Sequence, residues 1–108
     1  MDKNEFECGA GWHHLIEPLL NRLHEMGGTA TQIKEKFGEL RFHYHEGEDD
    51  IAPFSVWERF AEDVLEAEQK SRKTCELCGA PGVTMVKGGW FKTVCDEHAK
   101  QLGYKGRA

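Results

Sequence analysis

The sequence predicts an α+β fold in which an N-terminal helix, a β-hairpin and a second helix pack together and are followed by a small C-terminal lobe. Three observations predict it. Two segments repeat apolar residues at helical spacing, the segment between them alternates polar and apolar residues, and two metal-ligand-like pairs lie near the C-terminus. We expect an α+β domain over residues 1–73 and the lobe over residues 74–108, with the polar segment Glu68–Lys73 at the boundary.

The first helix is expected over residues of about 12–26, where apolar residues recur at i, i+3, i+4 and i+7 and Gly27-Gly28 follows. Its predicted apolar face consists of Trp12, Leu15, Ile16, Leu19, Leu20, Leu23 and Met26. Pro18 falls on the polar side. Because proline lacks an N–H, we expect either a kink at Pro18 or a helix that begins near Leu15.

The hairpin is expected over residues of about 30–45, with its turn at Phe37-Gly38. Its second strand alternates two sets of side chains, which predicts one buried face. The apolar set is Leu40, Phe42 and Tyr44, and the polar set is Arg41, His43 and His45. The acidic segment Glu46–Asp50 is expected to be a loop.

The second helix is expected over residues of about 54–70. Its predicted apolar face consists of Trp57, Phe60, Ala61, Val64 and Leu65. Two signals mark its start: Pro53 at a first-turn position, and a capping box formed by Ser55 with Glu58.

Four residues near the C-terminus have the spacing of metal ligands. Cys75 and Cys78 are separated by two residues, sixteen residues follow, and Cys95 and His98 repeat the same gap. Three thiolates and an imidazole in two close pairs suit tetrahedral Zn²⁺, so we expect one zinc ion per chain.

The segment between the two pairs supports this interpretation. Val83–Val86 and Trp90–Val94 read as short strands around the turn Lys87-Gly88-Gly89. Cys95 and His98 fall where a helix should begin, with Asp96 and Glu97 in its first turn and Gly103 as its stop. A knuckle, a hairpin and a helix whose first turn supplies the last ligands form a treble-clef-like zinc lobe.

The zinc is expected to be structural, because four protein ligands close the coordination sphere that a catalytic zinc keeps open for water. The lobe has only 35 residues, which is below the size at which a core suffices without metal. The sequence contains no glycine-rich phosphate loop, nucleophile elbow or paired-carboxylate pattern, so we expect no enzymatic activity and no small-molecule substrate. Cys8 has no paired neighbour and is expected to be a buried or idle thiol.

Composition and charge restrict the function classes further. The net charge is −5, and residues 1–52 carry five Lys/Arg against eleven Asp/Glu. Residues 74–108 carry five against three, so neither part concentrates basic residues as nucleic-acid-binding proteins usually do. No apolar run is long enough to cross a membrane and the N-terminus lacks the pattern of a signal peptide, so we expect a cytoplasmic location with reduced thiols.

Three motifs resemble a family of small proteins encoded by bacteriophages and prophages. They are "CGAGW" at residues 8–12, "KEKFGELRF" at residues 34–42 and "TCELCGAPG…GGWFKTVCDEHA" at residues 74–99. The resemblance implies a zinc-stabilised accessory protein that works in the cytoplasm of a bacterial host. It implies no particular activity.

Three functions compete on this basis. The first is binding to a host or phage protein, including the inhibition of a host enzyme or defence complex. The second is nucleic-acid binding through Lys87, Lys92, Lys100, Lys105 and Arg107, with Trp90 or Phe91 for stacking. The third is a hydrolase or nuclease with a second metal at His43 and His45.

Six residues form the candidate interaction surface: Arg41, His43, His45, Lys87, Trp90 and Lys92. The solvated strand face is the ordinary explanation for the two histidines. Trp90, like Trp12 and Trp57, lies on an apolar pattern that core packing also explains. The sequence assigns no oligomeric state.

Overall fold

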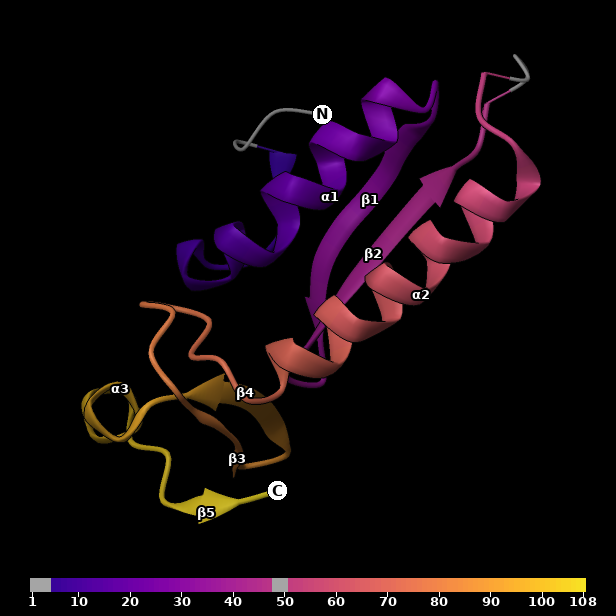
Figure 1. Cartoon of the computed structure of the whole chain (residues 1–108). Coiled ribbons are helices and arrows are strands. Elements are labelled where there is room, and N and C mark those ends of the chain that lie inside the picture. Colours follow the sequence, from indigo (N-terminus) through magenta and orange to yellow (C-terminus); the bar gives the residue numbers. More distant parts are fainter. Residues whose placement is uncertain (1–4, 48–50) are drawn as a thin grey trace.

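The computed structural model describes residues 5–47 and 51–108 (Figure 1). A 3₁₀ turn at Ala10–Trp12 leads into α1 (His13–Glu25), β1 (Thr29–Lys36), β2 (Glu39–His45) and α2 (Phe54–Ser71). The C-terminal lobe contains β3 (Val83–Lys87), β4 (Trp90–Val94), α3 (Asp96–Leu102) and β5 (Gly106–Arg107). The structure is therefore mixed α+β, as the sequence predicts. None of the described helices has the length and apolarity needed to cross a membrane.

Helix α1 begins at His13 and contains Pro18, so of the two alternatives the start near Leu15 is wrong. Pro18 is exposed, as its place on the polar side predicts. The buried face consists of Ile16, Leu19, Leu20 and Leu23. Helical packing of this face outweighs the cost of the hydrogen bond that Pro18 cannot donate.

Strands β1 and β2 form an antiparallel hairpin closed by the two residues Phe37 and Gly38. Both have positive φ, 55° and 80°, which is the type I′ geometry that matches the twist of a hairpin. Register pairs Ile33 with Phe42, and an irregularity between Ala30 and Gln32 keeps both Ala30 and Ile33 on the buried side. The acidic loop expected at Glu46–Asp50 lies partly outside the described residues.

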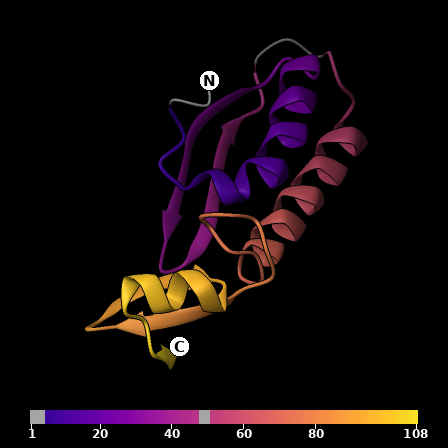
Figure 2. The ribbon, with the colours of Figure 1, turned by 90° about the vertical axis from the view of Figure 1, so that its left-hand side faces the viewer.

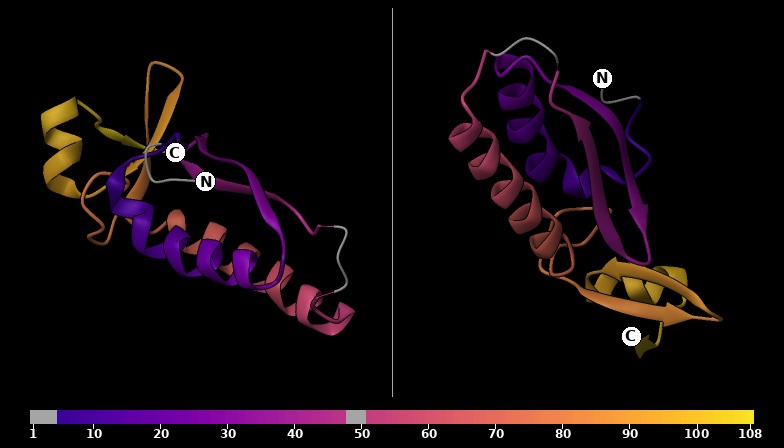
Figure 3. Two further views of the ribbon diagram at one scale, coloured as in Figure 1. Left: turned by 90° about the horizontal axis from the view of Figure 1, so that it is seen from above. Right: turned by 90° about the vertical axis from the view of Figure 1, so that its right-hand side faces the viewer.

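Helices α1 and α2 both lie on one face of this hairpin, and the opposite face carries no helix (Figure 3). The main core fills the space between them. Its largest members with no exposed surface are Trp12, Ile16, Leu23, Ile33, Leu40 and Phe60. Of the residues predicted for the apolar face of α2, Leu65 is exposed. Ala67 and Ser71, which were not predicted for this face, are buried.

The outer edge of β2 is capped by two polar side chains from the last turns of α2. The Leu40 N–H donates to Ser71 Oγ at 2.9 Å, and the Phe42 N–H donates to Glu68 Oε2 at 2.9 Å. These bonds satisfy strand groups that would otherwise be unpaired in or near the core. The polar segment at Glu68–Lys73 thus has a packing role in addition to connecting the two parts of the chain.

The predicted capping box at the start of α2 is wrong. Pro53 occupies the N-cap position with φ −67° and ψ 159°, and no side chain caps the helix there. Phe54 is the first helical residue, so Ser55 already lies inside the helix. The extended backbone that proline favours sets the start two residues earlier than the serine would.

The C-terminal lobe lies at the turn end of the β1–β2 hairpin (Figures 1 and 2). Its three strands are ordered β4-β3-β5, and β5 is an element that the sequence does not predict. Its buried hydrophobic cluster contains only Cys75, Val94 and Ala99, with Met85, Cys95 and Tyr104 partly buried against it. A core of this size is small for a unit that folds without additional stabilisation.

The "CGAGW" segment joins the two parts of the chain. The Gly11 N–H donates to the Glu76 carbonyl oxygen at 2.7 Å, and the indole N–H of Trp12 donates to the Thr74 carbonyl at 2.8 Å. A Cβ at Gly9 would overlap the carbonyl oxygen of Glu76, and one at Gly11 would overlap that of Cys75. Both glycines therefore allow a backbone-to-backbone approach that any side chain would block.

Substitution Gly11→Ala is expected to destabilise the protein by about 2–3 kcal/mol, because the added methyl group forces the two backbones apart. Gly106→Ala is the matched control, since its Cβ would make only ordinary contact with Val86 at 3.8 Å. Thermal unfolding followed by circular dichroism measures both. Equal melting temperatures for the two variants would contradict this account of the junction.

Candidate metal centre

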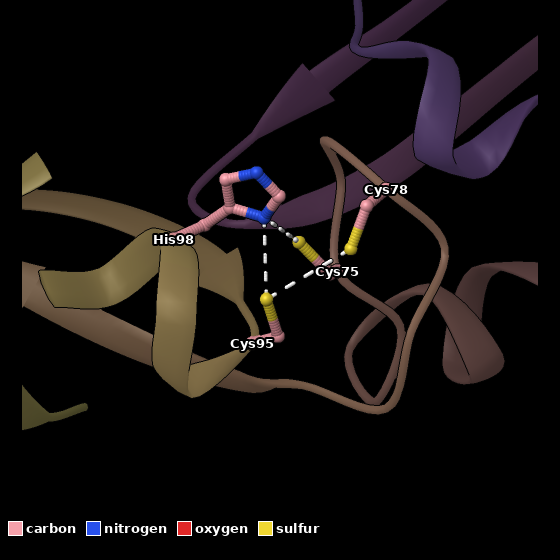
Figure 4. Close-up of side chains that lie close together, drawn as sticks. All are labelled: Cys75, Cys78, Cys95 and His98. Carbon is pink, nitrogen blue, oxygen red and sulfur yellow. Dashed lines mark hydrogen bonds between the residues drawn. The ribbon is translucent and has the colours of Figure 1, made fainter. Parts of the chain in front are cut away.

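Cys75, Cys78, Cys95 and His98 converge at the base of the C-terminal lobe (Figure 4). Their ligand atoms all lie within 4.8 Å of one another. The Cys95 Sγ to His98 Nδ1 distance is 3.2 Å, the Cys75 Sγ to His98 Nδ1 distance is 3.5 Å, and the Cys78 Sγ to Cys95 Sγ distance is 3.8 Å. The group could hold a metal ion.

The first pair lies on a tight loop closed by backbone hydrogen bonds. The Cys75 N–H donates to the Ala80 carbonyl at 2.7 Å, and the Gly79 N–H donates to the Cys75 carbonyl at 2.9 Å. Gly79 has φ +82°, a left-handed conformation that favours glycine. The Glu76 N–H donates to the Thr93 carbonyl at 2.9 Å, which fixes the loop against β4.

The second pair lies where β4 passes into α3. Cys95 is the N-cap of α3 and His98 lies in its first turn, together with the predicted acidic residues Asp96 and Glu97. Gly103 ends the helix in the left-handed conformation with φ 81°, as the sequence predicts. The β3–β4 hairpin, closed by Gly88 and Gly89, brings this pair back to the first.

The spacing of the donor atoms fits a tetrahedral site. With metal–sulfur bonds of about 2.3 Å and metal–nitrogen bonds of about 2.0–2.1 Å, a regular tetrahedron has edges of about 3.8 Å between sulfurs and about 3.6 Å between sulfur and nitrogen. The three distances given above, 3.2 and 3.5 Å between sulfur and nitrogen and 3.8 Å between sulfurs, lie close to these edges. Three sulfurs and one imidazole nitrogen form the donor set that Zn²⁺ prefers, and all four positions come from the protein.

The protein environment favours the thiolate form at Cys75. Burial acts to raise the pKa of this thiol, but backbone N–H groups, that of Cys95 foremost, outweigh burial and lower the pKa from 9.0 to about 6. At the exposed Cys78, the Ala80 backbone N–H acts to lower the pKa, but desolvation and the neighbouring cysteine sulfurs together raise it. A bound metal cation would offset the repulsion between the negatively charged cysteine thiolates.

Cys8 is not part of this group. Burial, followed by the charges of Glu76 and Glu35, raises its pKa from 9.0 to about 12. A nucleophilic cysteine needs a lowered pKa, so the geometry agrees with an idle, half-buried thiol.

The six residues of the candidate interaction surface fall into two groups. Arg41, His43 and His45 lie on the solvent-facing side of β2, with Arg41 at 3.6 Å from Glu39. Lys87, Trp90 and Lys92 lie on the β3–β4 hairpin. No cluster of three or more potential metal ligands includes either histidine within residues 5–47 and 51–108.

Trp90 corrects the expectation of core packing, because 76% of its surface is exposed, whereas Trp12 and Trp57 are buried. The apolar pattern of β4 predicted a buried face, but the lobe is too small to cover it. Val94 is buried at one end of the strand and Trp90 is left in solvent at the other.

Two residues near these sites escaped the sequence analysis. Phe37 is 66% exposed and its ring lies 6.0 Å from that of Phe91. Glu76 is 4% exposed, accepts a hydrogen bond from the Gly9 N–H at 2.8 Å and pairs with Lys92 at 3.1 Å. Glu76 stands within the Cys-x₂-Cys spacing, and Phe37 stands beside a turn glycine, but neither pattern indicates a contact so distant in sequence.

Comparison with known proteins finds no family model, no curated protein and no solved structure that matches this chain. The resemblance to small phage and prophage proteins therefore stays a prediction from the three motifs.

Cys95→Ser is expected to remove most of the bound zinc and to unfold the C-terminal lobe, because structural zinc binding supplies about 10–16 kcal/mol in small zinc peptides. Metal content by mass spectrometry and amide chemical-shift dispersion measure the two effects. Cys8→Ala is the control and should keep one zinc per chain. Retention of the folded lobe in metal-free Cys95→Ser protein would contradict a structural role.

The Cys8 thiol of the folded, metal-loaded protein is expected to react with iodoacetamide at pH 8 at least about a hundredfold more slowly than a free cysteine. With its pKa at about 12, the Cys8 thiol has roughly a thousandth of the thiolate that a free cysteine has at that pH. Peptide mapping by mass spectrometry measures the rate, with the denatured, chelated chain as the reference. Equal rates in the two states would show that the burial and carboxylates around Cys8 do not hold its proton.

Proposed function

We propose that this chain is a zinc-stabilised accessory protein that acts by binding another protein, and that its treble-clef-like lobe is a scaffold for the contact surface. The observation that carries the proposal is a cluster of exposed aromatic side chains, Phe37, Trp90 and Phe91, which we call the aromatic patch. Their exposed fractions are 66%, 76% and 37%.

The aromatic patch is assembled from two distant parts of the chain. Phe37 comes from the β1–β2 turn and the other two rings come from β4. The Thr93 hydroxyl donates to the Gly38 carbonyl oxygen at 2.5 Å, which fastens the turn against the lobe. Shallow hollows flank Trp90 on both sides, one shared with Phe37 and Phe91 and the other with Leu102 and Tyr104.

Exposed aromatic residues next to concave surface are typical of protein-binding sites. Tryptophan is enriched among residues whose truncation costs most binding energy, because it buries a large area at a small entropic cost. Leaving three such rings in water serves no folding purpose that the described contacts show. Their burial against a partner would recover the hydrophobic free energy.

The nucleic-acid alternative has a specific observation in its favour, since Lys87 and Lys92 both line the hollow beside Trp90. Both are engaged within the protein, however. Lys87 donates to the Leu102 carbonyl at 2.8 Å, and Lys92 pairs with the buried Glu76. Nucleic-acid binding gains its affinity from cationic side chains that are free to neutralise the phosphates. Because both lysines are already engaged, we favour a protein partner.

The hydrolase alternative has no supporting geometry. His43 and His45 are exposed on β2 and belong to no ligand cluster in the described part of the chain. The Cys3His group offers a full set of four protein ligands, which leaves no position for a substrate or an activated water.

The biological setting that we propose is inferred from the resemblance to small phage and prophage proteins. It supports a role in the cytoplasm of an infected or lysogenic bacterium, with a host or phage protein as partner. A small protein without a catalytic constellation fits inhibition of a host enzyme or defence complex, since blocking a surface needs only affinity.

Trp90→Ala is expected to weaken partner binding by about thirtyfold, which corresponds to the loss of about 2 kcal/mol at a central contact residue. Affinity capture from bacterial lysate, with the bound protein then titrated by calorimetry, measures the change. Phe54→Ala is the matched control, because Phe54 is also 76% exposed but lies at the start of α2.

The proposal requires the captured protein to bind the Phe54→Ala variant as tightly as the wild type. A partner that binds the Trp90→Ala variant equally well would contradict it. So would loss of capture after nuclease treatment, which would assign the surface to nucleic acid.

A further inference from the structure

The aromatic patch contains both a projecting ring and a hollow beside it. The projecting ring is Trp90, whose side chain is 76% exposed. The hollow that it shares with Phe37 and Phe91, which we call the Phe37 hollow, has a volume of about 540 Å³. Sites of this volume enclose small organic molecules, so an indole side chain fits the Phe37 hollow in size.

The turn of the β3–β4 hairpin leaves the Phe37 hollow open to an approaching molecule. Gly88 and Gly89 line the hollow, and a Cβ at either glycine would meet no atom within 4 Å apart from its chain neighbours. Both glycines have positive φ, 54° and 85°, as a two-residue hairpin turn requires. The hairpin also projects beyond the rest of the C-terminal lobe, so its end is accessible (Figures 2 and 3).

The rim of the Phe37 hollow carries one charge of each sign. Glu35 and Lys36 both line it. The Glu35 carboxylate is fixed there because its Oε2 accepts a hydrogen bond from the Gly38 N–H at 2.7 Å, and Lys36 Nζ lies 5.6 Å from the centre of the Phe37 ring. A balanced rim does not repel a copy of itself, because a two-fold axis can bring Lys36 of each copy toward Glu35 of the other.

We propose that a second copy of this chain covers the aromatic patch in the free protein, so that the protein is a two-fold symmetric dimer. Trp90 of each copy fills the Phe37 hollow of the other. A surface that carries a projecting ring beside a hollow of matching size complements itself, which is the requirement for a two-fold interface. The inference goes beyond the proposed function, since it concerns the protein without its partner, and a partner that binds the same patch competes with the second copy.

The exposed area of the rings predicts a weak dimer. Aromatic side chains bury about 150–250 Å² each, so with exposed fractions of 66%, 76% and 37% the three rings offer about 270–450 Å² per copy and about 540–900 Å² in a symmetric contact. Stable interfaces bury about 1,200–2,000 Å² in total, so residues around the rings have to supply the remainder. We expect a dissociation constant of about 10–100 µM, which leaves the patch accessible to a partner that binds more tightly.

Sedimentation velocity of the zinc-loaded full chain between about 2 and about 500 µM measures the association, and we expect a monomer that converts to a dimer over this range. Tryptophan emission gives a second readout. Trp12 and Trp57 are buried within each copy and Trp90 is exposed, so dilution should shift the emission to longer wavelength. Because the contact is mainly apolar, raising salt from about 50 to about 500 mM should change the dissociation constant by less than about threefold.

Trp90→Ala is expected to raise the dissociation constant by at least about a hundredfold, because the symmetry removes two rings from each dimer. Phe54→Ala is the matched control, since Phe54 is also 76% exposed but lies at the start of α2, and it should associate as the wild type does. Both variants should melt at the wild-type temperature at a concentration where the chain is monomeric, which separates lost association from lost folding.

The location of the interface is tested by nuclear magnetic resonance on an equimolar mixture of isotope-labelled and unlabelled chains. An isotope-filtered experiment reports only contacts between different copies. We expect nuclear Overhauser contacts between the Trp90 indole of one copy and the Phe37 ring of the other. Contacts between copies that involve Phe54 in place of these rings would overturn the inference.

Three results in solution would also overturn it. They are a monomer at all concentrations up to about 500 µM, an association that Trp90→Ala keeps and Phe54→Ala loses, and species that grow beyond the dimer with concentration, which would assign the contact to an open, head-to-tail arrangement. If the chain is monomeric while Trp90-dependent capture of a partner succeeds, the dimer is wrong and the proposed function stands. If the dimer forms through Trp90 while partner capture is independent of Trp90, the dimer stands and the proposed contact surface is wrong.

Discussion

Backbone hydrogen bonds hold Glu76 from two sides, and the position of the C-terminal lobe relative to the first part of the chain depends on them. On one side, the Gly11 N–H bonds to the Glu76 carbonyl, and on the other, the Glu76 N–H bonds to the Thr93 carbonyl. The Glu76 carboxylate is nearly buried, which is costly unless it is satisfied, and it accepts bonds from the Gly9 backbone and from Lys92. One candidate metal ligand, Cys75, is therefore fixed by the first part of the chain as well as by its own loop.

The same arrangement explains why the exposed aromatic rings meet. Once β4 is aligned by Glu76, Thr93 reaches the Gly38 carbonyl and brings the β1–β2 turn onto the lobe. A Cβ at Gly38 would lie 2.8 Å from Thr84 Cγ2, so the contact depends on a glycine at that position. Phe37 then lies beside Phe91, with ring centroids 6.0 Å apart, so the fold of the lobe that carries the candidate metal ligands also positions the exposed rings.

The sequence by itself determined the order and type of the main elements, because periodicities of 3.6 and 2 follow directly from helix and strand geometry. It also determined the four candidate metal ligands, since Cys75, Cys78, Cys95 and His98 carry their spacing in the chain. Only the tertiary structure decided that Trp90 stays in solvent, that Ser71 and Glu68 cap β2, and that Phe37 meets Phe91. These outcomes depend on how two elements approach each other, and contacts between residues tens of positions apart leave no periodic trace in the sequence.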